Sequence, residues 1–385
     1  MADHSVFEQS SILVSDQKTD QILLLRDLDG DGSASAEQEV STFFDHSNLS
    51  GFSAPTANVF SLHQGSDGAI FVGDGQSDAI YRLRDLNGDS DAQDAGEAQL
   101  WFSADNAASL PFVTPNGMWQ GADGALYVAN AGTPVEPADA IYRLVDLNGD
   151  GDANDADEAV AWLDLSDSGS KAVPFSISFD GDVAYINDLA GVASQSVYRL
   201  EDLNGDGTIS AAEVLPFVSA DMAFSSALNV ASLTVADEAV FALSWQPHEG
   251  NTIHLFRLED IDGSGQIDEV AEIWNSLTLP VETKVHIAYS VAADTAGDLS
   301  ISAYGFDGSA SILRLHDVNQ DQDFMDSGEA TLFGSSTFTQ DLFKPRAVEF
   351  YEGAQPFLAS NPVPLVEDGL IALAVAMMVQ RFFAT

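Results

Sequence analysis

The chain has 385 residues, 45% of them hydrophobic, and its 61 acidic and 13 basic side chains give a formal net charge of −48. This apolar content is enough for a large core, so the acidity does not indicate disorder. The negative charge argues against binding nucleic acid or anionic lipid, and the absence of cysteine excludes disulfides.

One phrase recurs six times along the chain, an apolar and aromatic run followed by an acidic loop. An arginine in each copy marks the repeat, and successive arginines lie 56, 61, 56, 58 and 57 residues apart. The six are Arg26, Arg82, Arg143, Arg199, Arg257 and Arg314. A constant period of this length indicates a repeated supersecondary unit. We expect these arginines to pair with carboxylates between strands or blades.

Each repeat is predicted to contain four short strands. In the third copy they cover residues 116–119, 124–129, 140–145 and 159–163. Alternating polarity, β-branched and aromatic residues, and Gly/Asp turns favour strands over helices. A four-stranded unit of about fifty-seven residues is a propeller blade, so the sequence predicts an all-β, six-bladed β-propeller.

The two ends of the repeat region predict how the ring closes. The first copy begins at Ser11 with what reads as a second strand, and a spare strand, residues 346–351, follows the sixth copy. That C-terminal strand would complete blade one and remove an open sheet edge. The predicted propeller therefore spans residues 6–352.

Residues 353–385 form a proline-containing linker and an apolar C-terminal tail. Its Val-Pro-Leu and apolar stretch resemble the sorting tails of bacterial surface proteins, but Glu367 and Asp368 interrupt the stretch and Arg381 alone follows it. We favour a short helix docked on the propeller or a flexible tail. Any membrane contact is expected only through this segment, since its longest apolar run is too short for a span.

The acidic loops have the ligand spacing of calcium sites. Ca²⁺ takes six to eight oxygens, and an EF-hand loop offers them at positions 1, 3, 5, 7 and 12. The fourth copy fits from Asp202 to Glu213, and the other five place the closing glutamate one residue later. We therefore predict about six calcium ions, one in each blade. The alternative is solvated acidic turns without metal.

The predicted ligands are the following, loop by loop: Asp27, Asp29, Asp31, Ser33, Glu39; Asp85, Asn87, Asp89, Asp91, Glu97; Asp146, Asn148, Asp150, Asp152, Glu158; Asp202, Asn204, Asp206, Thr208, Glu213; Asp260, Asp262, Ser264, Gln266, Glu272; and Asp317, Asn319, Asp321, Asp323, Glu329.

The calcium is expected to be structural, because a sensory EF-hand needs mobile helices and these loops join strands. Loops of this kind usually need millimolar calcium, which predicts an extracellular or cell-surface location. Residues 1–20 show no signal-peptide pattern, and a leaderless export route or an upstream segment would reconcile the two. Abundant surface acid and only four lysines are typical of proteins from a marine or halophilic bacterium.

Catalytic candidates lie where the first strands of the blades begin, at the mouth of the central channel. They are Asn58, Asn116, Asn229, His286 and Arg346, with Glu349 further along the closing strand. Pro115-Asn116-Gly117 and the following blade phrase resemble the gluconolactonase-like and NHL-type six-bladed propellers. In gluconolactonase-like enzymes such an asparagine can ligate a catalytic divalent metal, although that family's glutamate and aspartate ligands cannot be placed here.

Two functions therefore remain open. The preferred prediction is a calcium-binding extracellular or cell-surface propeller that acts as a binding module, with an unknown ligand or protein partner on the face opposite the calcium loops. The loops of that face vary most between repeats, as a comparison of residues 130–139 with residues 74–78 shows. The alternative is a metal-dependent hydrolase of lactonase or esterase type at the channel mouth.

Overall fold

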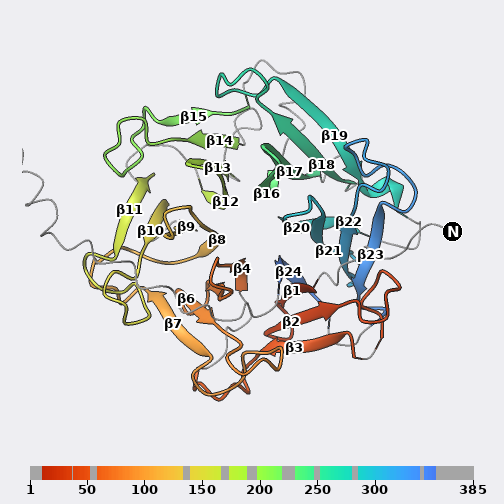
Figure 1. Cartoon of the computed structure of the whole chain (residues 1–385), viewed down its shortest axis with the longest axis horizontal. Helices are drawn as coiled ribbons and strands as arrows, with labels where there is room; N and C mark the ends of the chain where they lie inside the picture. The colour runs from red at the N-terminus through yellow and green to blue at the C-terminus, as the bar shows by residue number, and fades with distance from the viewer. Residues whose placement is uncertain are drawn as a thin grey trace, which may run out of the picture.

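The structure, a computed structural model, describes residues 11–36, 38–52, 59–132, 139–165, 173–188, 197–218, 230–246, 252–279, 285–338 and 342–352. These residues form six four-stranded antiparallel sheets arranged in a ring around a central axis (Figure 1). The predicted all-β, six-bladed propeller is confirmed. Short β-rich runs separated by Gly/Asp turns form single blades, and the blades bury their faces only against one another.

The strands of each blade, from the channel outward, are as follows. Blade one has β24 (Pro345–Tyr351), β1 (Ser11–Asp16), β2 (Gln21–Arg26) and β3 (Val40–Phe44). Blade two has β4 (Val59–Gln64), β5 (Ile70–Asp74), β6 (Ala79–Leu83) and β7 (Ala98–Ser103). Blade three has β8 (Pro115–Gln120), β9 (Leu126–Asn130), β10 (Ala140–Leu144) and β11 (Ala159–Asp164).

The second half of the ring repeats this order. Blade four has β12 (Pro174–Asp180), β13 (Val183–Asp188), β14 (Val197–Leu200) and β15 (Val214–Pro216). Blade five has β16 (Val230–Ala236), β17 (Ala239–Gln246), β18 (Thr252–Glu259) and β19 (Glu269–Asn275), followed by a 3₁₀ turn, η2 (Ser276–Thr278). Blade six has β20 (Ile287–Ala293), β21 (Leu299–Tyr304), β22 (Ala310–Leu315) and β23 (Ala330–Ser335).

Ring closure follows the predicted scheme. The C-terminal strand β24 pairs antiparallel with β1, placing Phe350 opposite Ile12 and Val348 opposite Val14. Blade one is thus built from both ends of the repeat region. Its innermost strand comes from the C-terminal side and contacts the innermost strands of blades two and six.

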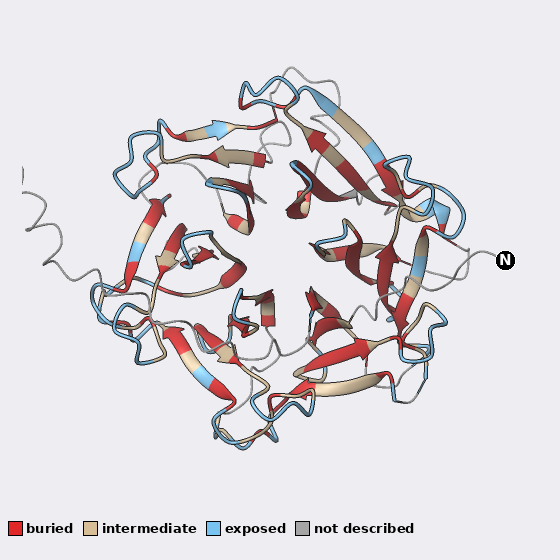
Figure 2. Cartoon of the chain, viewed as in Figure 1, coloured by how far each residue is buried: buried red, intermediate tan, exposed pale blue. Residues whose placement is uncertain are grey.

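Strand alternation explains why both faces of each blade are apolar. In β1, Ile12 and Val14 are buried with Ile312 of blade six, whereas Leu13 is buried with Ile70 of blade two. Successive side chains of a strand point to opposite faces of the sheet, so one strand serves two inter-blade cores. Exposed residues concentrate in the outer strands and connecting loops (Figure 2).

The strand order assigns the connections to two faces of the ring. The six acidic loops, which join third to fourth strands, lie on one face together with the connections between first and second strands; we call it the loop face. The connections from second to third strands, and from each blade to the next, lie on the opposite face. The predicted variable loop 130–139 falls partly, and the tail 353–385 wholly, outside the described residues.

In the described residues, no helix is long and apolar enough to span a membrane.

Most repeat arginines pair with carboxylates, but only three do so between strands, as expected, while Arg199 and Arg257 pair with a glutamate two residues further along the chain. Five of them form ion pairs: Arg82 with Asp67, Arg143 with Asp123, Arg199 with Glu201, Arg257 with Glu259 and Arg314 with Asp298. Arg26 differs, because its guanidinium donates to the Ser90 hydroxyl in the next blade. Arg26 directly precedes the first loop, as Arg84 precedes the second, so it occupies the position of Arg84 rather than that of Arg82.

Removal of the closing strand should prevent folding. A chain that ends at Phe343 lacks all of β24, exposes the edge of β1 and opens the channel, so we expect aggregation or loss of cooperative unfolding. A chain that ends at Glu352 keeps β24 and should melt close to the full-length protein. Thermal unfolding followed by circular dichroism tests both truncations, and a normal melt of the shorter chain would contradict this closure scheme.

Candidate functional site

The first aspartate of each acidic loop organises the loop backbone. In the first loop the Asp27 carboxylate accepts hydrogen bonds from the backbone N–H groups of Gly30 (2.7 Å), Asp31 (3.1 Å) and Gly32 (2.9 Å). The two glycines have φ of 79° and 89°, a left-handed conformation that costs glycine least. This geometry explains the recurring Asp-Gly spacing, and the loop curls around the Asp27 side chain.

The closing glutamate completes this network from the other end of the loop. Glu39 accepts hydrogen bonds from the N–H groups of Leu28 (2.9 Å), Asp29 (3.2 Å) and Ala36 (2.7 Å). Burial alone would raise the Glu39 pKa, but the backbone hydrogen bonds outweigh it and hold the pKa below its ordinary value. The carboxylate is therefore charged at neutral pH, as a metal ligand must be.

Four of the loops bring three carboxylates together. In each, one oxygen from every member lies within 4.8 Å of the others. The groups are Asp27, Asp29 and Glu39; Asp150, Asp152 and Glu158; Asp260, Asp262 and Asp268; and Asp317, Asp321 and Glu329. Oxygen atoms at such separations can share one hard cation.

The structure corrects the fifth loop. The sequence-based ligand Glu272 lies on β19, where it faces the imidazole of His254 at 2.9 Å and accepts from the Asn275 amide. Asp268 takes the closing place instead, accepting the N–H groups of Ile261 and Asp262, both at 2.9 Å. The fifth loop reaches its fourth strand sooner than the others, so counting residues from Asp260 overshoots the closing position.

Three further loop carboxylates were missed by the sequence analysis. In the second loop, the Asn87 amide donates to Asp89 (2.9 Å) and also to Asp94 (2.6 Å). Asp155 and Asp326 are held in the same way in the third and sixth loops. Each precedes its closing glutamate by three residues, so a recurring Asp-x-x-Glu spacing was the available signal.

Every acidic loop also clamps its blade to the preceding one. In the second loop, the backbone N–H of Ala92 donates to the carbonyl of Phe43 in blade one at 2.8 Å. The equivalent bonds are Ala34 to Phe333, Ala153 to Trp101, Ile209 to Trp162, Ile267 to Phe217 and Phe324 to Ile273. The donor residues are buried, so the shape of each loop decides how two neighbouring blades meet.

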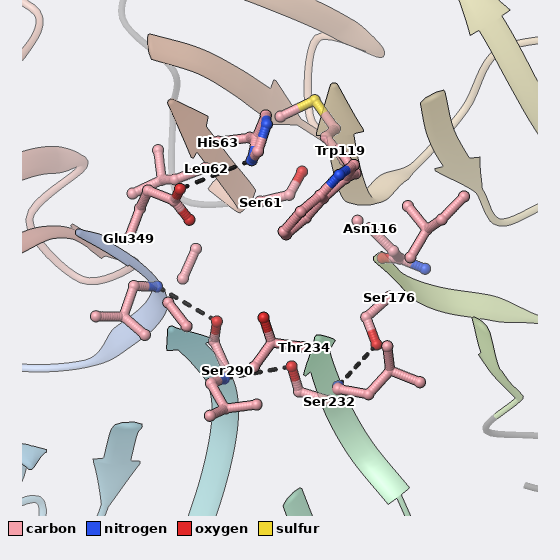
Figure 3. A pocket seen from close by; sticks show the side chains of 18 of the residues that line it. Ser61, Leu62, His63, Asn116, Trp119, Ser176, Ser232, Thr234, Ser290 and Glu349 are labelled. Atoms are coloured by element: carbon pink, nitrogen blue, oxygen red, sulfur yellow. Dashed lines mark hydrogen bonds and ion pairs between the residues drawn. The ribbon is translucent and has the colours of Figure 1, made fainter. Parts of the chain in front are cut away.

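The channel contains a polar cavity of about 110 Å³ (Figure 3). Serines of the innermost strands line it, and their hydroxyls link neighbouring blades. Ser176 accepts the N–H of Leu233 at 3.0 Å, and Ser232 accepts the N–H of Val291 at 3.3 Å. These hydroxyls therefore serve the junctions between blades, and the lining also contains His63, Asn116 and Glu349.

Two of the predicted channel residues line this cavity. Asn116 is buried and its amide donates to the Pro174 carbonyl at 3.4 Å, while Glu349 lies further along the channel. His286 instead stacks on Phe306, with ring centroids 4.7 Å apart. Asn58 and Asn229 lie outside the described residues. Among the described residues, Glu349 is the one carboxylate that lines the cavity, so Asn116 has no acidic companion beside it.

His63, which the sequence did not single out, faces Glu349. Its Nδ1 lies 3.7 Å from Glu349 Oε1, and its Nε2 accepts the backbone N–H of Gln120 at 3.0 Å. Because Nε2 is an acceptor, the proton of the neutral ring is on Nδ1 and points toward Glu349. The N–H of Gln64 also donates to Glu349 Oε1, at 3.3 Å.

Burial shifts both pKa values toward the neutral forms. It raises the pKa of Glu349 to about 8, against the opposing hydrogen bond from Gln64, and lowers the pKa of His63 to about 4. The two groups lie within ion-pair distance, but desolvation disfavours the charged pair. At neutral pH we therefore assign a protonated Glu349 next to a neutral His63.

Comparison with known proteins supports the fold class. No family model and no curated protein sequence matches this chain. A chain of the nidogen/laminin complex is 12% identical, with a TM-score of 0.50 over 90% of this chain and 100% of that one. A gluconolactonase from Xanthomonas campestris is 18% identical, with a TM-score of 0.47, and the match covers 76% of this chain and 79% of that one.

A catalytically inactive virginiamycin B lyase from Staphylococcus aureus, solved with quinupristin, is 16% identical, with a TM-score of 0.46 over 86% of this chain and 89% of that chain. At 12% identity, the likeness to the chain of the nidogen/laminin complex shows a common architecture only. The protein is thus a six-bladed β-propeller whose blades each carry an acidic loop.

The Glu349 carboxyl should impose a pH dependence on stability. Because its pKa is raised on folding, its contribution to the free energy of unfolding is complete below pH 4.5 and is lost as the pH rises through 8. His63, with a lowered pKa, contributes above pH 6.5 and loses that contribution as the pH falls through 4. The two linkages cancel between pH 4.5 and 6.5, so above 6.5 stability should fall with pH through Glu349 alone.

Glu349→Gln keeps the neutral shape and should abolish this decline, which amounts to about 2 kcal/mol between pH 6.5 and 8. Urea unfolding of both proteins at these two pH values measures the difference. The exposed Glu352 provides the control Glu352→Gln, which should follow the wild type. Parallel pH profiles for wild type and Glu349→Gln would show that Glu349 is ionised throughout.

Proposed function

We propose that the protein is a calcium-stabilised binding propeller, with one structural Ca²⁺ in each acidic loop. The supporting observation is that four loops bring three carboxylates together and that all six loops carry a backbone clamp to the preceding blade. A cation that fixes the loop therefore also fixes the junction between two blades. All six junctions of the ring carry such a clamp.

The ligand chemistry favours calcium over other metals. The predicted ligands are carboxylate, amide and hydroxyl oxygens and include no sulfur, a set that suits hard cations. The loops join two strands, so they lack the mobile helices of a calcium sensor. With calcium at about 100 times its dissociation constant, each site would stabilise the fold by roughly 2.7 kcal/mol.

The binding role belongs to the face opposite the acidic loops. Recognition usually resides in loops carried by a rigid scaffold, and on this face blade-to-blade connections surround the channel. An extracellular or cell-surface location is part of the proposal, because structural calcium loops of modest affinity are filled at millimolar calcium. The loop face would then hold the metal ions, and the opposite face would bind the ligand.

Metal removal should destabilise the ring. Protein dialysed into 1 mM Ca²⁺ is expected to hold five to seven ions per chain by elemental analysis, because six loops carry ligands. Chelation at low salt should lower the melting temperature by tens of degrees, since carboxylate repulsion then acts across every clamp. Two or fewer ions, or an unchanged melt, would refute the calcium proposal.

The fifth loop permits a paired test of its ligand assignment. Asp268→Asn should remove about one ion and destabilise the calcium-loaded protein by about 2–3 kcal/mol, because Asp268 closes the loop. Glu272→Gln is the matched control and should keep the full calcium content, because Glu272 faces His254. Loss of the ion in Glu272→Gln but not in Asp268→Asn would reverse the assignment.

A metal-dependent hydrolase is the second candidate. One observation favours it: Asn116, His63 and Glu349 line the same channel cavity, and the protonated Glu349 could serve as a general acid. Turnover of lactones and simple esters in the presence of Ca²⁺, Mg²⁺, Mn²⁺ or Zn²⁺ tests this function. Activity that is lost in both Asn116→Ala and Glu349→Gln, with the loop calcium retained, would establish the hydrolase in place of the binding module.

A further inference from the structure

Arg346 lies at the channel mouth on the face opposite the acidic loops. It is the second residue of β24, and its Cζ lies 4.6 Å from the ring centroids of Phe60 and Tyr289 and 5.9 Å from that of Phe175. Phe60 and Tyr289 belong to the two blades beside blade one, and Phe175 belongs to blade four, across the ring. The guanidinium therefore reaches from blade one toward the propeller axis.

Arg346 differs in its partners from the other arginines that the structure describes. Six described arginines form ion pairs with carboxylates, and Arg26 donates to Ser90. Among the described residues, no carboxylate lies within ion-pair distance of Arg346, whose neighbours are aromatic rings and the Tyr289 hydroxyl. In a chain of net charge −48, a guanidinium among aromatic rings without a nearby carboxylate is an exception.

The surrounding chemistry favours an anion as the missing partner. A guanidinium has five N–H donors in a planar fork, and aromatic faces satisfy its charge but accept few of its hydrogen bonds. The two described lysines, Lys18 and Lys344, also belong to connections on this face. The acidic loops occupy the other face, so their carboxylates lie away from the mouth that holds Arg346.

We propose that Arg346 binds the carboxylate of a small monocarboxylate ligand at this mouth, with the apolar part of the ligand against Phe60 and Tyr289. The planar fork matches a carboxylate through two parallel hydrogen bonds. A tetrahedral dianion would require further cationic donors, and its second charge would be repelled more strongly by the acidic protein. This inference rests on the proposed binding role and names its ligand class.

Sodium benzoate is the probe, and benzamide is its uncharged analogue of the same shape. Ligand-observed NMR titrations in 1 mM Ca²⁺ and about 0.15 M salt, which screens the long-range field, should show saturable benzoate binding. Benzamide should bind at least tenfold more weakly. Absence of saturable benzoate binding, or equal binding of benzamide, would overturn the proposal. Tighter binding of sulfate than of benzoate would overturn the carboxylate assignment.

Two variants with the same change in net charge locate the site. Arg346→Gln should weaken benzoate binding at least tenfold, whereas Arg84→Gln should not, because Arg84 pairs with Asp67 on the loop face. Equal affinity in Arg346→Gln and wild type would overturn the proposal. If Arg346→Gln fails to fold, Arg346→Lys replaces it. This variant keeps the charge but lacks the fork, so unchanged benzoate affinity would contradict the assigned geometry.

The same samples separate this inference from the proposed calcium role. Benzoate binding together with a melting temperature that chelator does not change would support the Arg346 site and refute calcium binding by the loops. A calcium-dependent melt without benzoate binding would support the loops and refute the Arg346 site.

Discussion

The hydrogen bond from each acidic loop to the preceding blade is the contact on which the ring depends. A blade cannot bury its two apolar faces alone, and its neighbours must meet it at a fixed register. The bond from Ala34 to Phe333 shows this at the closing junction, where blade one meets blade six. The bond forms only if the loop keeps its curled shape. The electrostatics of the loop therefore affect the geometry of the ring.

The loops place many negative charges where the blades must be held together. Backbone N–H groups offset part of this charge, as around Asp27 and Glu39, but a bound cation would offset far more of it. Because a cation would offset the repulsion between the carboxylates of a loop, the stability of the fold would depend on the cations in the solution. Under the proposed calcium role, such a fold would be stable where divalent cations or salt are abundant.

Strand β24 couples closure of the ring to completion of the channel. It supplies Arg346 near one mouth and Glu349 further along, and it pairs with β1 to complete blade one. The channel groups are therefore assembled only when the C-terminal strand is in place. An incompletely closed ring would lack both Glu349 and Arg346 in the channel.

The sequence by itself determined the blade number, the closing strand and the positions of the six acidic loops, because these follow from a period, an alternation and a local spacing that folding does not change. Only the tertiary structure decided which groups meet across blades. His63 faces Glu349 from another blade, and Phe60 and Tyr289 flank Arg346 from two others. Asp268 replaced Glu272 because strand pairing, which ends each loop, depends on the whole sheet rather than on a residue count.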